Sequence, residues 1–238
     1  RKMYQFFIED ENVSEESVII EGSDVNHIKN VLRMKSGEKI RVCTRDGRNY
    51  FCSISDITDS FVRADILEKE AESTELPCRI YLFQGLPKSD KMEWIIQKTV
   101  ELGVYEVIPV AMKNCVAKLD DKKAKAKVNR WQAIAESAAK QSKRSLIPEI
   151  KMPMTYKEAL SYAKELDVKL VPYENERGMA GTKTAVDEIK AGSRIAVFIG
   201  PEGGFSPEEI DMVRDEMQLI SLGKRILRTE TAAITTLA

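Results

Sequence analysis

From residue 80 onward, the sequence alternates apolar runs of strand length with longer segments whose apolar residues recur at helical spacing. Strands are predicted over 80–84, 107–110, 169–172, 195–199 and 219–221. Helices are predicted over about 90–102, 120–142, 156–166 and 207–216, with a last one that begins near Glu230. Strands that alternate with helices build a parallel sheet covered on both faces, so this part of the chain is predicted to be an α/β domain.

The first seventy residues show a different pattern. Short β-rich runs over 6–8, 18–20, 40–44, 50–57 and 61–67 are separated by turn sequences such as Arg-Asp-Gly. A short helix is predicted over Asp24–Val31, with Ser23 or Asp24 as its cap. Strands this short and this close predict a small barrel. The glutamate-rich stretch 68–75, closed by Pro77, is predicted to be a linker.

The overall charge gives little indication of a nucleic-acid partner, because the net charge is −1 and the pI is near 6.1. The charge is unevenly distributed, however, since residues 113–144 hold ten basic residues against three acidic ones. A local basic face can bind phosphates even on a neutral protein. A lysine-rich helix that is merely solvated explains the same pattern, and both interpretations remain open.

The cysteine and histidine counts limit the chemistry. Four scattered cysteines without a Cys-x-x-Cys pair predict reduced, partly buried thiols, and a single histidine, His27, leaves no multi-histidine metal site. No metal is therefore expected. No apolar run reaches the length of a membrane span, and the first residues lack a signal-peptide pattern, so a cytoplasmic protein without membrane contact is expected.

Two glycine-containing segments follow predicted strands near the end of the chain. The first is Gly200-Pro-Glu-Gly-Gly204 after the strand 195–199, followed by Ser206, which has Glu209 at capping-box distance. The second is Leu222-Gly223 after the strand 219–221. Ligands bind at the carboxyl ends of such strands, and glycine lets the backbone approach a flat ring or a ribose. Neither segment is a dinucleotide fingerprint or a phosphate loop, so a cofactor pocket of another design is expected.

In spacing and order, the two segments resemble the cofactor loops of the SPOUT (α/β-knot) methyltransferases. The whole chain resembles the bacterial 16S ribosomal RNA uracil-N3 methyltransferase family. The matching stretches follow the family's order: Met3-Tyr-Gln-Phe-Phe7, His27-x-x-x-Val31-Leu-Arg33-Met, Gly85-Leu-Pro-Lys-Ser-Asp-Lys-Met-Glu93, Gln97-Lys98-x-x-Glu101-Leu-Gly103, Arg130-Trp131, Gln141-Ser142-x-Arg144 and Pro172-Tyr-Glu174. Departures are Gln5 where arginine is frequent, Asn114-Cys115 where Arg-Ser is common, and Lys143 where glycine is common.

The resemblance implies a PUA-like β-barrel that holds RNA over residues 1–74 and a SPOUT methyltransferase domain with a trefoil knot over 75–238. It also implies S-adenosylmethionine as cofactor, 16S rRNA of the small ribosomal subunit as substrate, and a homodimer with its pockets near the subunit interface. A knot is a rare exception to ordinary chain topology, so only the resemblance suggests it.

The residues expected to bind the cofactor lie mainly on the two glycine segments. They are Glu174, Ile199, Gly200, Pro201, Gly203, Gly204, Ser221, Leu222, Gly223, Ile226, Leu227, Thr231 and Ala232. Glu174 is expected to reach a ribose hydroxyl or the methionine amine, with an ordinary surface carboxylate as the alternative. The residues expected to contact RNA are His27, Arg33, Lys88, Lys91 and Arg144.

Methylation of a uracil N3 requires removal of its proton and stabilisation of the resulting anion. Arg228 is the candidate for stabilising negative charge on a uracil carbonyl, and the alternative is a structural pair with Glu230 or Glu202. Glu230 has two candidate roles, to cap the last helix through the helix dipole or to accept the proton, and the first is favoured.

Two competing functions remain open at this point. One is a non-catalytic RNA-binding or ribosome-assembly factor with the same fold. The other is a methyltransferase that acts on a transfer RNA or on a 23S site.

Overall fold

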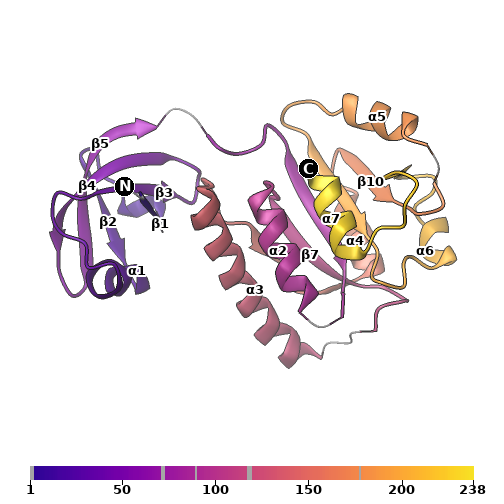
Figure 1. Cartoon of the computed structure of the whole chain (residues 1–238), viewed down its shortest axis with the longest axis horizontal. Helices are drawn as coiled ribbons and strands as arrows, with labels where there is room; N and C mark the ends of the chain where they lie inside the picture. The colour runs from indigo at the N-terminus through magenta and orange to yellow at the C-terminus, as the bar shows by residue number, and fades with distance from the viewer. Residues whose placement is uncertain (1–2, 71–72, 89, 117–119, 177) are drawn as a thin grey trace. The chain divides into compact units, whose positions relative to one another are not determined.

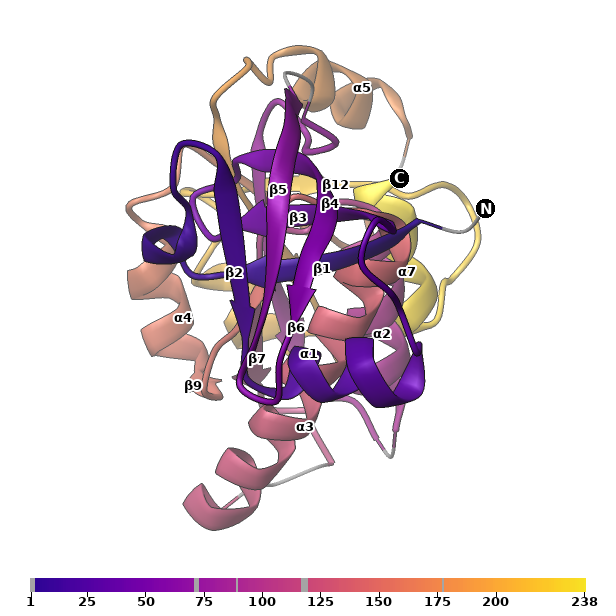
Figure 2. The same cartoon turned by 90° about the vertical axis from the view of Figure 1, so that its left-hand side faces the viewer.

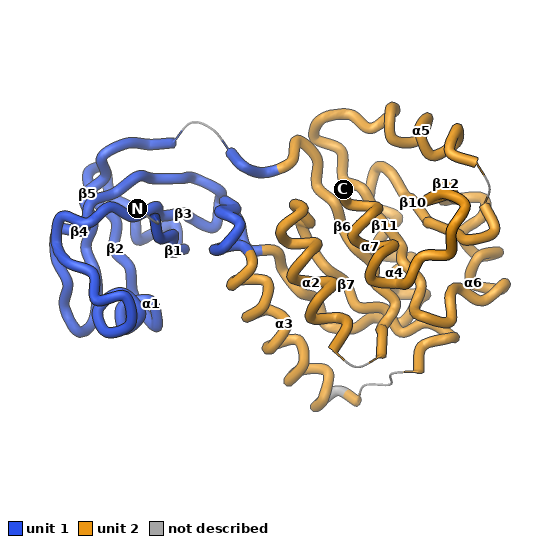
Figure 3. The backbone as a smooth tube through the Cα atoms, viewed as in Figure 1, with its two compact units in different colours: residues 1–75, 139–147 blue, residues 76–138, 148–238 orange. Residues whose placement is uncertain are grey.

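The computed structural model describes residues 3–70, 73–88, 90–116, 120–176 and 178–238, and the chain forms two compact units (Figure 3). Unit 1 comprises residues 1–75 and 139–147, and unit 2 comprises residues 76–138 and 148–238. Sequence analysis assigned 139–147 to the second domain, whereas their contacts place them in unit 1.

Unit 1 is built on one curled five-stranded sheet that forms a half-barrel (Figure 2). Its strands are ordered β1 (Tyr4–Ile8), β3 (Lys39–Thr44), β4 (Asn49–Ile57), β5 (Phe61–Glu70) and β2 (Ser17–Glu21). β1 and β3 are parallel, and the other pairs are antiparallel. Two register shifts between β4 and β5 increase the local twist and help the sheet to curl around its apolar core. A short 3-10 helix, η1 (Asp10–Asn12), follows β1.

Two local predictions in unit 1 are wrong. The predicted helix divides into α1 (Ser23–Asn26) and a π-helical turn, η2 (His27–Val31), and its N-cap is Gly22 rather than Ser23 or Asp24. The predicted linker is partly strand, because β5 continues to Glu70, which pairs with Asn49. Strand pairing therefore overrides the acidic composition of residues 68–70.

The four cysteines are free thiols, and Cys43 and Cys52 lie in the core of unit 1. Burial raises the pKa of both thiols to about 12, which keeps them protonated.

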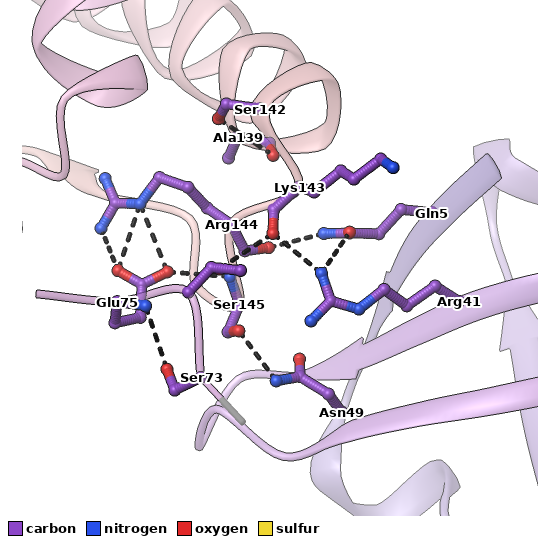
Figure 4. Close-up of polar contacts among 11 residues, drawn as sticks. Gln5, Arg41, Asn49, Ser73, Glu75, Ala139, Ser142, Lys143, Arg144 and Ser145 are labelled. Atoms are coloured by element: carbon purple, nitrogen blue, oxygen red, sulfur yellow. Dashed lines mark hydrogen bonds and ion pairs between the residues drawn. The ribbon is translucent and has the colours of Figure 1, made fainter. Parts of the chain in front are cut away.

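Polar contacts attach residues 143–145 to the sheet of unit 1 (Figure 4). The buried Arg41 guanidinium donates to the Lys143 carbonyl at 2.8 Å and to the Gln5 side-chain oxygen at 3.1 Å. The Gln5 amide in turn donates to the Arg144 carbonyl. Asn49 donates to the Ser145 hydroxyl at 2.8 Å. Gln5, which departs from the arginine that is frequent at this position, thus joins the sheet to this segment.

Glu75 completes the same network from the other side (Figure 4). Its carboxylate pairs with the Arg144 guanidinium and accepts the Ser145 backbone N–H at 2.8 Å. The Arg144 side chain is only 4% exposed. A buried guanidinium that is paired with a carboxylate is not presented to phosphate, so Arg144 is removed from the set of RNA-contacting residues.

Unit 2 contains a parallel sheet of seven strands. Six follow the order β12 (Gln218–Ile220), β10 (Val168–Pro172), β11 (Arg194–Ile199), β6 (Arg79–Gly85), β7 (Glu106–Ala111) and β8 (Glu149–Ile150). β9 (Met154–Thr155) also pairs with β7. The aromatic rings of Phe83 and Phe198 stack at 4.4 Å in the core between the sheet and the helices.

The helices of unit 2 cover both faces of the sheet (Figures 1 and 2). α4 (Tyr156–Ala163) and α6 (Pro207–Asp211) pack on the face that bears Phe83 and Phe198. α2 (Lys91–Glu101) and α7 (Thr229–Leu237) pack together on the other face. α3 (Asp121–Ser142) lies beside α2, joined to it by the Arg130–Glu93 ion pair. Among the described residues, no helix has the length and apolarity to cross a membrane.

Most of the predicted elements of unit 2 are confirmed, with three differences. α6 ends at Asp211 rather than at 216, and α4 ends at Ala163 rather than at 166. α5 (Ala180–Asp187) and the two-residue strands β8 and β9 had no sequence prediction. α5 carries threonines, glycine and aspartate, so its sequence has little helical signature.

The chain returns from the edge strand β12 to the middle of the sheet, where α7 contacts α2, β6 and β11. The connection between β10 and β11 lies beside the start of this return, because Thr182 in α5 forms hydrogen bonds with the backbone of Ser221, directly after β12. A threaded C-terminal segment requires such a crossing of two connections. The knot itself remains a prediction.

The last turn of α3 ends in a Schellman motif centred on Lys143. The Arg144 N–H bonds to the Ala139 carbonyl at 3.0 Å, and the Lys143 N–H bonds to the Lys140 carbonyl at 3.4 Å. Lys143 has a φ of +60°, in the left-handed region where glycine is comfortable and other residues are strained. This explains why glycine is suited to the position.

We expect Lys143→Gly to stabilise unit 1, because it relieves the left-handed strain while the carbonyl contacts of residue 143 remain. The free energy of unfolding in urea should rise by about 1 kcal/mol. The matched control is Gln141→Gly two residues earlier in the regular helix, where glycine should cost roughly 0.5–1 kcal/mol. A loss of stability in the Lys143 variant would contradict the conclusion that the backbone of Lys143 is strained.

Candidate active site

Unit 2 contains a cavity of about 420 Å³ at the carboxyl edge of its sheet. Its walls come from three strand ends: the segment after β10, the glycine turn after β11 and the loop between β12 and α7. The lining residues are Lys91, Pro172, Tyr173, Glu174, Ile199, Gly200, Pro201, Glu202, Gly203, Gly204, Phe205, Leu222, Gly223, Arg225, Ile226, Leu227, Arg228, Thr229 and Ala232. A cavity of this size is suited to a small-molecule ligand.

The structure brings most of the expected cofactor-binding residues together around this cavity. Those that line it are Glu174, Ile199, Gly200, Pro201, Gly203, Gly204, Leu222, Gly223, Ile226, Leu227 and Ala232. Two do not line it. Ser221 is buried and bonds to Thr182, and Thr231 points to solvent on the first turn of α7.

Sequence analysis missed six lining residues: Pro172, Tyr173, Glu202, Phe205, Arg225 and Thr229. Five of them, all but Pro172, lie directly beside residues that were singled out. Their place at the ends of predicted strands was therefore the available signal. Lys91 also lines the cavity, although it was assigned to RNA alone.

Close packing against Gly85 and Asn114 fixes the conformation of the glycine turn. A Cβ on Gly85, at the end of β6, would lie 2.7 Å from the Pro201 backbone nitrogen and ring. A Cβ on Gly203 would lie 2.9 Å from the Asn114 side chain. Asn114 also donates to the carbonyls of Gly203 at 3.1 Å and Gly204 at 3.2 Å. The turn therefore has no room for side chains at these points, and Asn114 gives it a specific anchor.

The Thr229 hydroxyl connects three segments that are remote in sequence. It accepts a hydrogen bond from the Gln84 amide of β6 at 2.8 Å and donates to the Gly200 carbonyl at 2.6 Å. Both Gln84 and Thr229 are buried. The start of α7 is thereby tied to the central strand and to the glycine turn.

Lys91 lies between two carboxylates at the edge of the cavity. Its Nζ is 3.3 Å from Oε1 of Glu202 on the glycine turn and 3.4 Å from Oε2 of Glu230 on α7. Burial acts to raise the pKa of Glu202, but the Lys88 backbone N–H and the Lys91 ammonium outweigh it and hold the pKa below its ordinary value. The Glu230 Oε2 atom is buried and has no hydrogen-bond partner among the described residues.

Arg228 lines the cavity, is exposed, and is the N-cap residue of α7. In the described part of the chain it forms no ion pair, whereas Glu230 and Glu202 both face Lys91. The structure therefore does not contain the alternative ion pair of Arg228 with Glu230 or Glu202. Glu230 lies in the first turn of α7, where the helix dipole stabilises a carboxylate. The N-cap of α7 forms no side-chain capping hydrogen bond.

The remaining RNA candidates lie on the surface. His27 and Arg33 are exposed on unit 1. His27 is the first residue of the π-helical turn η2, and Arg33 follows that turn with a φ of +52°. Lys88 is exposed on unit 2, where its backbone N–H donates to Glu202 at 3.0 Å. Among the residues with described positions, no group of histidine, cysteine or carboxylate side chains is arranged to hold a metal ion.

The chain matches two family models, an RNA methyltransferase domain over residues 74–238 and an RNA methyltransferase PUA domain over residues 20–67. The protein thus belongs to the RNA methyltransferases, with a SPOUT-type catalytic domain and a PUA-like domain.

Within that class it belongs to the family of ribosomal RNA small subunit methyltransferase E. The protein of that name from Bacillus subtilis is 39% identical over 90% of this chain and 86% of the relative. The one from Mesomycoplasma hyopneumoniae is 37% identical over 98% of this chain and 96% of the relative.

Solved structures agree with this assignment. Ribosomal RNA small subunit methyltransferase E from Neisseria gonorrhoeae, bound to S-adenosyl methionine, has a TM-score of 0.85 and 31% identity, covering 99% of this chain and 95% of that one. A protein from Legionella pneumophila in complex with the cofactor SAM has a TM-score of 0.84 and 30% identity, covering 100% of this chain and 96% of that one.

The Thr229 link predicts a specific loss of stability. In Thr229→Val, the Gly200 carbonyl loses its buried donor, so the free energy of unfolding of unit 2 should fall by about 2 kcal/mol. Thr229→Ser keeps the hydroxyl and should remain within about 1 kcal/mol of the wild type. The measurement is urea unfolding followed by circular dichroism, and equal stabilities of the two variants would refute the link.

Proposed function

We propose that this chain transfers a methyl group from S-adenosylmethionine to N3 of a uracil in 16S ribosomal RNA of the small ribosomal subunit. The observation that carries the proposal is the cavity at the carboxyl edge of unit 2. Both glycine segments wall this cavity, and Arg228 stands at it without an ion pair in the described part of the chain. Two structures of related proteins that hold S-adenosylmethionine support the choice of cofactor.

The residues around the cavity suit this cofactor. Its volume falls in the range of small-molecule sites, and the turn at Gly200–Gly204 presents bare backbone at its three glycines. Leu222, Ile226 and Leu227 supply apolar surface for a flat ring. The Glu174 Oε1 atom lies 4.0 Å from where a Cβ on Gly204 would be, which places a carboxylate in position for a hydroxyl or an amine. When bound, S-adenosylmethionine supplies an electrophilic methyl group on its sulfonium.

Arg228 is assigned to the uracil carbonyl. Loss of the N3 proton spreads negative charge onto the neighbouring carbonyl oxygens of the base. A guanidinium that remains charged, lies at the cavity and has no carboxylate partner among the described residues can stabilise that charge.

Glu230 is assigned as the proton acceptor. Its Oε2 atom is buried without a hydrogen bond among the described residues, so the carboxylate retains acceptor capacity. Glu230 does not itself line the cavity, but its Oε2 lies 3.4 Å from Nζ of Lys91, which does. His27, Arg33 and Lys88 are assigned to RNA phosphates, and Lys91 is assigned to both tasks.

We further propose a homodimer in the cytoplasm. The large apolar side chains exposed on unit 2 include Ile226 on the cavity loop at 82% and Trp94 on α2 at 49%. Exposed apolar groups beside a site are typical of a contact surface. A dimer with its pockets near the interface would cover the cavity loop.

The decisive experiment separates methylation from RNA binding alone. The protein, shown by light scattering to be a dimer, is incubated with S-adenosylmethionine and small ribosomal subunits from a strain that lacks the gene. We expect S-adenosylmethionine binding by calorimetry and N3-methyluridine in the 16S rRNA by mass spectrometry of its nucleosides.

The alternatives make different predictions for the same preparations. A non-catalytic assembly factor would bind RNA in a salt-dependent manner, unchanged by Gly203→Ala, and would transfer no methyl group. Gly203→Ala should weaken S-adenosylmethionine binding, because its Cβ would meet Asn114, while Gly181→Ala in open space serves as the control. The third possibility is tested by comparing RNA from the wild type and the deletion strain. If N3-methyluridine is lost from transfer RNA or 23S rRNA in the deletion strain, that RNA is the substrate instead of 16S rRNA.

The two catalytic assignments predict losses in kcat rather than in cofactor binding. Arg228→Gln should lower kcat by about 10²–10³, since one charge-stabilising donor is removed from the reacting base. Glu230→Gln should lower kcat by about 10²–10⁴. The remaining rate should rise with pH in proportion to the hydroxide concentration. S-adenosylmethionine affinity should change little in either variant. A variant with unchanged kcat would remove that residue from the mechanism.

A further inference from the structure

The first ten residues of α3 are strongly basic. Between residues 122 and 135 the sequence contains five basic residues and no acidic one. They are Lys122, Lys123, Lys125, Lys127 and Arg130. Packing does not require them, because the side chains that this part of the helix buries are Ala124 and Trp131.

This placement works against the helix itself. The amino end of a helix carries partial positive charge, so lysines in the first turn are disfavoured relative to acidic or neutral residues. Asp120 compensates in part, because its Oδ1 accepts the Lys123 backbone N–H at 2.8 Å and its Oδ2 pairs with Lys123 Nζ at 3.2 Å. No ion pair of Asp120 with the ammonium groups of Lys122 or Lys125 is present among the described residues.

The five cations differ in how they are partnered. Arg130 forms a two-pronged ion pair with Glu93, at 2.8 and 2.9 Å, and Lys127 lies over the Trp131 ring at 5.9 Å. Lys122 and Lys125 are exposed and form no ion pair with any residue that the structure describes. These two are one helical turn apart on the same face, so their ammonium groups are neighbours.

Topology places these two lysines at the working edge of unit 2. The connection from the end of β7 to α3 includes Asn114, which holds the carbonyls of Gly203 and Gly204. α2, α3 and α7 all begin at this edge of the sheet (Figure 1). The amino-terminal half of α3 therefore begins on the connection that leaves this edge, and its Arg130 pairs with Glu93 in the first turn of α2.

We propose that Lys122 and Lys125 form an RNA-binding surface for phosphates of the strand that flanks the target nucleotide. The proposal rests on the proposed function and adds to it a surface outside the cavity. Two mobile ammonium groups one turn apart suit successive phosphates, and they position the RNA without reading its sequence. The Arg130–Glu93 pair holds the helix against α2 and so fixes this surface relative to the cavity.

The test compares Lys122→Gln/Lys125→Gln with a matched control, Lys164→Gln/Lys190→Gln. The control pair is also exposed on unit 2 but precedes β10 and β11, at the opposite edge of the sheet. Binding of protein-free 16S rRNA is measured by filter retention between 0.05 and 0.5 M KCl, a range of about one decade suited to counterion-release analysis. Removing two phosphate contacts should reduce the slope of log K against log salt by about 1.4 and weaken binding roughly tenfold near 0.15 M.

Three outcomes are informative. A reduced slope in the α3 variant alone, with KM for RNA raised and both kcat and S-adenosylmethionine affinity unchanged, supports the proposal. Equal slopes for the α3 variant, the control and the wild type overturn it and identify α3 as a solvated face. Because binding is measured without methyl transfer, a wild type that binds RNA but never methylates it refutes the proposed function and leaves the α3 comparison readable.

Discussion

In a parallel sheet every strand ends at the same edge, and the site of this protein depends on that constraint. The ends of β10, β11 and β12 come from residues 172, 199 and 220, yet their loops wall one cavity. Gly85 at the end of β6 and Asn114 after β7 support the glycine turn that forms part of this wall. The wall combines backbone and apolar side chains with charged residues from each of these segments, including Glu174, Glu202 and Arg228.

The charged side of the site is organised by Lys91. It draws the carboxylates of Glu202 and Glu230 toward one point, one on the glycine turn and the other on α7. This arrangement leaves Arg228 without a competing carboxylate among the described residues, although acidic groups are close in sequence. Had Glu230 paired with Arg228 instead, both proposed catalytic groups would be neutralised by each other. The cation on α2 therefore determines which charges remain available to a substrate.

The sequence was sufficient to predict the strands, the helices around the site and eleven of the cavity residues, because apolar periodicity and strand-end glycines are local signals. It failed where the partner is distant along the chain. Ser221 was assigned to the cavity, but it bonds to Thr182, and Arg144 was assigned to RNA, but it is buried against Glu75. Thr229 was missed for the same reason, since its role depends on Gln84, 145 residues away. Lys143 is an intermediate case. The resemblance showed that glycine is common at this position, and the left-handed backbone of residue 143 explains why.

The contact between Gly85 and Pro201 has a consequence for how such a site changes in evolution. Gly85 does not line the cavity, yet even a methyl group there would collide with the backbone of the turn that does. Gly223 lines the cavity and has open space around it, but its φ of +109° lies in the left-handed region that favours glycine. Substitution is therefore restricted in two different ways. In this part of the cavity wall the limit is backbone conformation, and one layer beneath it the limit is close packing.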